Sequence, residues 1–199
     1  MVFNEFYKKL EKNKLYVFSL NDVLTIFPDA KKDCIKKCLY RWKKGQLIRS
    51  IKKGMYELIY PKEFFVSDLY LANKIYFPSY VSLETALSNY SIIPEVAMAV
   101  TSITTKPTRI FKNEHGLFKY RSIKLNAFCG YFIEKHRGFD VLMAEPEKAL
   151  VDYVYFKIKD NKVFDIDAER LDKDIVSNLN RKNLNKYARQ LNVNLKGLL

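Results

Sequence analysis

The spacing of apolar side chains in the first sixty residues predicts mainly helices, followed by a β-hairpin. A first helix is indicated by four residues at i, i+3, i+4 and i+7 spacing, namely Phe3, Phe6, Tyr7 and Leu10. A short extended run follows at 15–18. Ser19 then opens a Ser-x-x-acid capping pattern, which predicts a second helix that ends at Pro28.

A third helix and a hairpin complete this part of the chain. Asp29 is the expected N-cap of a helix over about 30–44, and Gly45 is expected to end it in the left-handed conformation. The expected buried face of this helix consists of Cys34, Ile35, Cys38, Leu39 and Trp42. Two short apolar runs, 46–51 and 55–59, flank a tight Gly-containing turn and predict a β-hairpin. The order helix, strand, helix, helix, hairpin is typical of a winged helix-turn-helix, with Lys52-Lys53-Gly54 at the tip of the wing.

Pro61 marks a predicted boundary between a winged helix-turn-helix domain, 1–61, and a second domain, 62–199. The second domain is expected to alternate helices and strands. Helices are predicted at 67–75, from Ser82, from Glu145 and twice in the tail beyond about Asp167. Strands are predicted at 100–105, 109–111, 117–123, 131–134 and 139–143. The expected class is α+β: a winged helix-turn-helix followed by a mixed α/β domain with a small antiparallel sheet and C-terminal helices.

The charge of the chain adds a candidate function to the predicted fold. The 199 residues are 48% hydrophobic and carry a formal net charge of +13, so a packed core is expected together with a polyanionic partner. Residues 1–60 hold 14 basic and 6 acidic side chains, a net +8. The amphipathic N-terminus lacks a signal-peptide pattern, and no window approaches the ~20 apolar residues of a membrane span. We therefore expect a cytoplasmic protein that does not contact membranes.

The basic residues gather on the third helix and the wing, where Asp33 is the one acid between Lys31 and Lys53. Side chains there would contact phosphates and base edges of double-stranded DNA. The predicted DNA-binding residues are Lys31, Lys32, Lys36, Lys37, Arg41, Lys43, Lys44, Arg49, Lys52 and Lys53. The candidates nearest to bases are Arg41, Trp42, Gln46 and Arg49. The alternative is a merely solvated helix face, but such a face usually mixes charges of both signs.

The three cysteines, Cys34, Cys38 and Cys129, form no C-x-x-C pair, which argues against a disulfide framework and against a zinc site. We expect Cys34 and Cys38 to lie in the core. The two histidines, His115 and His136, fall in predicted turns and are expected at the surface.

Three carboxylates near one predicted helix start, Glu145, Glu147 and Asp152, have two interpretations. Pro146 at the first helical position and acids in the first turn account for the segment as a helix start. The alternative is a carboxylate site for metal or acid–base chemistry, which would make the second domain an enzyme acting on nucleotides or RNA. The chain has no Gly-rich phosphate loop, Gly-x-Ser-x-Gly or His-Glu-x-x-His motif. We expect no enzyme, no cofactor and no metal.

Four segments of the second domain, in this order, resemble the AbiEi family. They are 78–87 (PSYVSLETAL), 90–94 (YSIIP), 100–105 (VTSITT) and 144–152 (AEPEKALVD). The resemblance extends from the winged helix to about Phe156, and the tail beyond about Asp160 carries no part of it. The family usually has Gly where this chain has Ser91.

AbiEi proteins are antitoxins and transcriptional regulators of type IV toxin–antitoxin systems, which serve in phage defence. The resemblance implies that the winged helix binds inverted repeats in its own promoter. It also implies that the second domain counters a nucleotidyltransferase-like toxin without a stable complex. It assigns no antitoxic role to any single residue. The alternative is a stand-alone regulator without a toxin partner.

Overall fold

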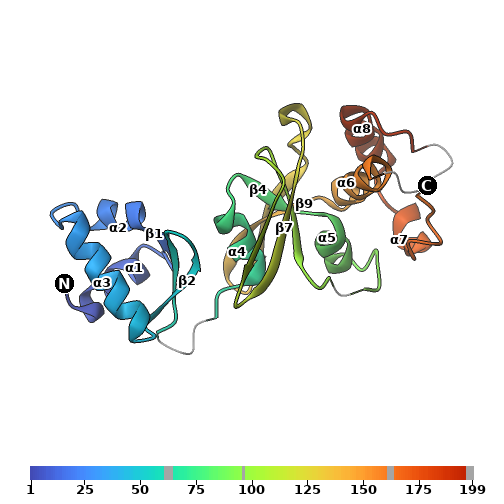
Figure 1. The fold of residues 1–199 in the computed structure, drawn as a ribbon. Coiled ribbons are helices and arrows are strands. Elements are labelled where there is room, and N and C mark those ends of the chain that lie inside the picture. Colours follow the sequence, from blue (N-terminus) through green and yellow to red (C-terminus); the bar gives the residue numbers. More distant parts are fainter. Residues whose placement is uncertain (61–64, 96, 161–163, 196–199) are drawn as a thin grey trace. The chain divides into compact units, whose positions relative to one another are not determined.

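The computed structural model describes residues 1–60, 65–95, 97–160 and 164–195. The chain divides into two compact units, Met1–Val66 and Ser67–Leu199, each with its own helices and sheet (Figure 1). The expected α+β class is confirmed. The predicted boundary residue Pro61 lies outside the described residues.

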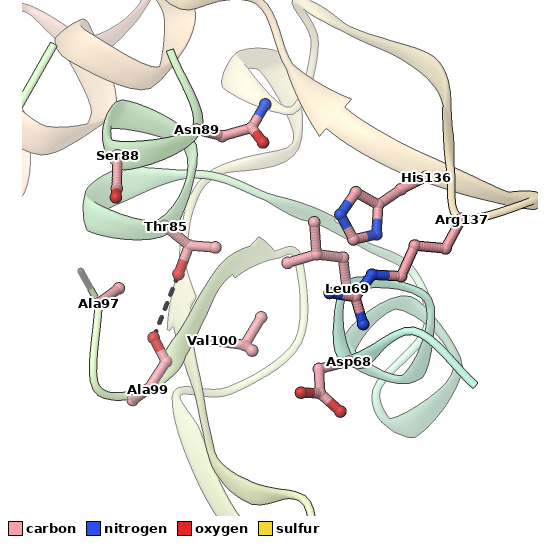
Figure 2. A pocket seen from close by; sticks show the side chains of 10 residues that line it. All are labelled: Asp68, Leu69, Thr85, Ser88, Asn89, Ala97, Ala99, Val100, His136 and Arg137. Carbon is pink, nitrogen blue, oxygen red and sulfur yellow. Dashed lines mark hydrogen bonds between the residues drawn. The ribbon is translucent and has the colours of Figure 1, made fainter. Parts of the chain in front are cut away.

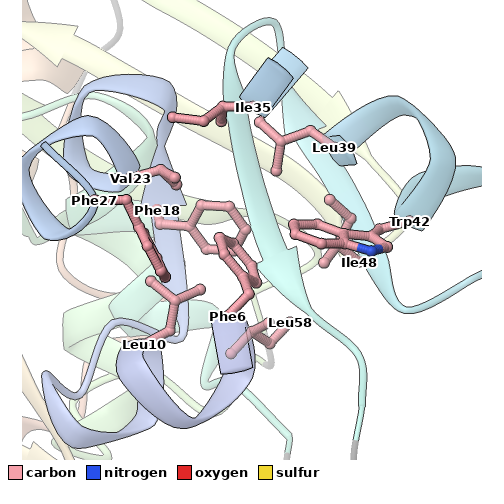
Figure 3. Close-up of a cluster of buried hydrophobic side chains, with 10 residues drawn as sticks. All are labelled: Phe6, Leu10, Phe18, Val23, Phe27, Ile35, Leu39, Trp42, Ile48 and Leu58. Carbon is pink, nitrogen blue, oxygen red and sulfur yellow. The ribbon is translucent and has the colours of Figure 1, made fainter. Parts of the chain in front are cut away.

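The first unit contains three helices and a three-stranded antiparallel sheet with strand order β1-β3-β2. Its elements are α1 (Phe3–Lys12), β1 (Val17–Ser19), α2 (Leu20–Ile26), α3 (Lys32–Lys44), β2 (Ile48–Lys52) and β3 (Met55–Leu58). The side chains of α1, α3 and the sheet enclose one apolar core (Figure 3). Within it the ring of Phe6 lies 4.5 Å from the ring of Trp42 and 5.5 Å from that of Phe18, measured between centroids.

The helix starts and ends of this unit match the sequence pattern in part. The capping box at Ser19 is confirmed, because the Asp22 amide donates to the Ser19 hydroxyl and the Ser19 amide donates to the Asp22 carboxylate. Asp29 was wrongly expected to cap α3, which begins two residues later with Lys31 as its N-cap. Gly45 ends α3 with φ −79°, so it is not left-handed; Gln46 takes that conformation with φ 53°.

The second unit is built on a six-stranded sheet with strand order β6-β7-β5-β4-β9-β8. Its elements are α4 (Asp68–Ile75), β4 (Ser79–Val81), α5 (Leu83–Asn89), β5 (Val100–Thr104), β6 (Arg109–Asn113), β7 (Gly116–Ser122), the 3-10 turn Leu125–Ala127, β8 (Tyr131–His136), β9 (Phe139–Ala144), α6 (Pro146–Lys159), α7 (Lys173–Ser177) and α8 (Arg181–Leu191). Helix α4 lies on one face of the sheet and α5 on the other, and α6 packs against α5 (Figure 1).

This sheet differs from the small antiparallel sheet predicted from the sequence. Strands β5 and β7 pair in parallel, as do β4 and β9, while the other pairs are antiparallel. Strand β4 lies between β5 and β9 although its three residues were not predicted as a strand. Its buried side chains on both faces explain why it lacks the alternation typical of a half-exposed strand.

Two details of the second unit bear on the sequence patterns. The predicted apolar stripe of the last helix, Leu184, Tyr187, Ala188 and Leu191, is buried as expected. Ser91 follows α5 with φ 57°, a left-handed conformation that glycine adopts more readily than serine. The backbone therefore gives a physical reason for a glycine at this position.

Candidate nucleic-acid interface

Helix α3 is divided lengthwise into an apolar side and a basic side. Ile35, Leu39 and Trp42 recur at i, i+4 and i+7, and all three are buried against α1 and the sheet (Figure 3). Because these residues anchor the helix by one face, the lysines between them are held on the opposite face. The core thus fixes the direction in which the basic side chains project.

The ten predicted DNA-binding residues are brought together on α3 and the β2–β3 hairpin. Eight of them are exposed, namely Lys31, Lys32, Lys36, Lys37, Arg41, Lys43, Lys44 and Lys53. Arg49 and Lys52, on β2, are half-buried. We call this set of ten the basic face.

Acidic groups lie close to some members of the basic face. Asp33 lies 3.3 Å from the ammonium of Lys36 at the start of α3, and both side chains are largely exposed. Arg49 lies 4.0 Å from the buried carboxylate of Glu57 on the neighbouring strand. The expectation that Arg49 is among the residues nearest to bases stays a prediction.

The hairpin presents a lysine at its turn. Gly54 has φ 78°, which lets the chain reverse direction between β2 and β3. Lys53 stands beside it and is exposed, and Lys52 is the last residue of β2. The tip of the hairpin therefore carries positive charge, and the hairpin directly follows α3 in the sequence.

Two other sequence expectations about α3 are wrong. Trp42, considered as a base contact, is 3% exposed and packs in the core against Phe6. Cys34, expected in the core, is exposed, whereas Cys38 is half-buried. Cys34 precedes Ile35, and one residue rotates a helix by about 100°, so it lies outside the stripe centred on Ile35, Leu39 and Trp42.

The carboxylates of α6 are used separately rather than in one site. Glu145 accepts a hydrogen bond from the Tyr187 hydroxyl at 2.6 Å. Glu147 accepts one from the backbone amide of Asn180 at 2.9 Å. Asp152 is fully buried in the interior of the unit. Within the described ranges, no three His, Cys, Asp or Glu side chains are grouped as metal ligands would be.

Asp152 organises a buried polar cluster that sequence reasoning missed. Its carboxylate accepts hydrogen bonds from the Tyr80 hydroxyl at 3.0 Å and the Ser82 hydroxyl at 2.9 Å, and it pairs with the ammonium of Lys148. We call Tyr80, Ser82, Lys148 and Asp152 the Asp152 cluster. Ser82 is the N-cap residue of α5 as expected, but its hydroxyl donates to Asp152 and makes no capping hydrogen bond. The i, i+4 spacing of Lys148 and Asp152 was the available signal.

Burial shapes the protonation of this cluster. Burial raises the pKa of Asp152 above its ordinary value, and the ammonium and the two hydroxyl donors oppose that effect. Burial, followed by the charge of Asp152, raises the pKa of Tyr80 well above its ordinary value. Tyr80 therefore remains a hydrogen-bond donor at any physiological pH.

The histidines also differ from the expectation of free surface residues. His136 Nδ1 lies 2.7 Å from the hydroxyl of Ser67, and His115 Nδ1 lies 3.0 Å from the carboxylate of Asp68. A pocket of about 290 Å³ opens beside them and is lined by Asp68, His136 and Arg137 on one side (Figure 2). On its other side the Thr85 hydroxyl donates to the Ala99 carbonyl. His136, at the end of β8, and His115, in the turn between β6 and β7, thus both contact residues at the start of α4.

No model of a known protein family matches the chain, and no curated protein matches it in sequence. None of the helices in the described part of the chain has the length and apolar character needed to cross a bilayer.

Proposed function

We propose that the first unit is a winged helix-turn-helix DNA-binding domain. In this proposal α2 and α3 form the helix-turn-helix, α3 is the recognition helix and the β2–β3 hairpin is the wing. We further propose that the protein represses its own promoter and acts as the antitoxin of a type IV toxin–antitoxin system. The order of helices and strands and the antiparallel sheet β1-β3-β2 support the first part.

The observation that carries the DNA-binding proposal is the two-sided structure of α3. The helix has 13 residues, about 20 Å of length, and fits the width and depth of a major groove. Its apolar side is occupied by the core, so the side left for a partner is the basic one. Lysines dominate that side, which favours phosphate contacts, and Arg41 is the exposed residue best suited to a guanine edge.

The antitoxin proposal rests on the resemblance of the second unit to AbiEi proteins. The four segments that carry the resemblance are far apart in sequence but adjoin in the fold. Strands β4 and β5 pair directly, and the Tyr90 hydroxyl donates to the Ala144 carbonyl at 2.7 Å. The hydroxyl of Ser82 reaches Asp152. The four segments thus lie in one structural unit.

Binding of the full chain to a duplex from its own upstream region should weaken steeply with salt. Each phosphate contact lowers the logarithm of the binding constant by about 0.9 per logarithmic unit of salt. If six of the basic-face residues contact phosphates, the slope should be about −5. Gel shifts at several salt concentrations measure this slope.

The matched controls are a shuffled duplex and a single-stranded RNA of the same length. The promoter duplex should be retained at salt concentrations that release both controls. Failure of the chain to shift any duplex at low salt would refute the repressor proposal.

Antitoxicity should be visible in cells that express the neighbouring nucleotidyltransferase-like reading frame. We expect growth arrest by that product alone and recovery when the full chain is co-expressed, because the second unit is proposed to counter its effect. Growth curves of four strains, which express neither protein, the nucleotidyltransferase-like product alone, the chain alone or both, provide the measurement. The absence of such a reading frame, or arrest that persists with the chain present, would leave a stand-alone regulator.

A further inference from the structure

The second unit contains a cavity of about 610 Å³ that the proposed functions do not use. It lies between the sheet and helices α5 and α6. Its charged lining includes Glu84 from α5, Lys119 and Arg121 from β7, and Asp160 after α6. The volume falls within the range of ~300–1,000 Å³ typical of small-molecule sites. It is formed entirely within the second unit and shares no residue with the basic face.

Arg121 forms a flat, fixed platform in this cavity. Its two terminal nitrogens donate to the two carboxylate oxygens of Asp160 at 2.7 and 2.8 Å. Its guanidinium lies over the ring of Phe156, 4.3 Å from the centroid. Asp160 thus occupies one edge and Phe156 one face, while the Arg121 side chain remains 31% exposed. A guanidinium held in this way offers its other face to a planar ring.

Glu84 supplies one carboxylate oxygen without a hydrogen-bond partner in the described part of the chain, while its charge acts on Arg121. Its Oε2 atom is buried and has no hydrogen-bond partner among the described residues. An ionised carboxylate only accepts hydrogen bonds, and leaving a buried acceptor unpaired is unfavourable. A ligand with an N–H group placed against Glu84 would therefore gain a charge-assisted hydrogen bond.

Lys119 supplies a positive charge on the same lining. Lys157, also at the cavity, is held by both carboxylate oxygens of Glu169 at 2.7 Å. Lys119 is exposed and has no acidic partner among the described residues. Its ammonium is thus the group left to meet an anion on a ligand.

We propose that this cavity binds a mononucleotide whose base carries an amino group. The base stacks on the open face of Arg121, its amino group donates to Glu84, and its phosphate pairs with Lys119. Arg121 favours a planar ring, Glu84 an N–H donor and Lys119 an anion. A mononucleotide of this kind has all three features. This inference goes beyond the DNA-binding and antitoxin proposals and does not depend on them.

Isothermal titration of the full chain with AMP and with purine riboside monophosphate tests the proposal. AMP should bind at least about tenfold more tightly than purine riboside monophosphate, which has the same kind of ring and phosphate but no N–H group on its base for Glu84; one charged hydrogen bond is worth about this much. Adenosine and inorganic phosphate, titrated separately, should each bind more weakly than AMP. Equal affinity for AMP and purine riboside monophosphate, or no heat at millimolar concentrations, would overturn the proposal.

Two variants and one control assign the contacts. Glu84→Gln should reduce the preference for AMP over purine riboside monophosphate, because a neutral acceptor replaces a charged one, and Lys119→Ala should weaken AMP about tenfold while leaving adenosine unchanged. Lys124→Ala removes an exposed lysine outside the cavity lining and should bind AMP as the unaltered chain does. Wild-type affinity in both test variants would refute the site. A chain that shifts promoter DNA but binds no nucleotide fails this proposal alone.

Discussion

Replacing Asp152 with alanine should destabilise the second unit by about 3–5 kcal/mol, because the substitution leaves the ammonium of Lys148 buried without a counter-charge. Lys148 and Asp152 are both fully buried, so water does not replace the lost partner. The hydroxyls of Tyr80 and Ser82 lose their acceptor in the same step. A loss of this size is a large part of the ~5–15 kcal/mol by which whole domains are stable.

The partner variants separate the charge effect from simple loss of packing. Lys148→Met should cost less than Asp152→Ala, because Asp152 keeps two hydroxyl donors and its raised pKa eases protonation. The double variant Lys148→Met with Asp152→Leu should recover part of the loss, since apolar replacement of a buried pair is often close to neutral. Asp140→Ala, which removes one partner of the exposed pair Lys135–Asp140, is the matched control and should cost less than about 1 kcal/mol.

Urea unfolding followed by two signals measures these differences. The one tryptophan, Trp42, lies in the core of the first unit, so its fluorescence reports that unit. Far-ultraviolet circular dichroism reports both units. Asp152→Ala should move the circular-dichroism transition to lower urea while leaving the Trp42 transition in place. Unchanged stability of Asp152→Ala would contradict the buried ion pair.

The same reasoning explains what the sequence predicts in this fold and what it does not. Some patterns that close within four residues were read correctly, such as the capping box at Ser19 and the hairpin turn at Gly54, whereas the cap expected at Asp29 and the left-handed conformation expected at Gly45 were not. Pairings between distant strands leave no local pattern. Strand β4 is three residues long and is placed by β5 and β9, which lie 19 and 58 residues further along when counted from Val81 to Val100 and to Phe139. The mixed sheet was therefore mistaken for a small antiparallel one.

The two candidate sites differ in the same way. The basic face lies on one helix and one hairpin, so helical periodicity and local charge suffice to predict its position. In the Asp152 cluster, Tyr80 and Ser82 precede Asp152 by 72 and 70 residues in the sequence. The sequence around Lys148 and Asp152 shows an ordinary helix start followed by an i, i+4 pair. The contribution of the cluster to stability follows from its burial, which the sequence does not show.

The double reversal Lys36→Glu with Lys37→Glu should abolish promoter binding while the first unit stays folded. Both side chains are exposed on the basic side of α3, and the core contacts of Ile35 and Leu39 are untouched. Loss of two phosphate contacts should weaken binding by ~100-fold or more, at about 1.5–3 kcal/mol for each charged hydrogen bond. The salt slope should fall in magnitude by about 2. Gel shifts measure both quantities.

The matched control reverses the same charges elsewhere on the same unit. Lys8→Glu with Lys12→Glu alters two exposed lysines of α1 and changes the net charge by the same amount. A general electrostatic attraction between a basic protein and DNA would weaken equally in both double variants. A docked α3 predicts loss in the first variant and a much smaller change in the second. Trp42 fluorescence must show a native unit in both, since unfolding of the Lys36 and Lys37 variant would mean that this face of α3 packs against the protein rather than against DNA.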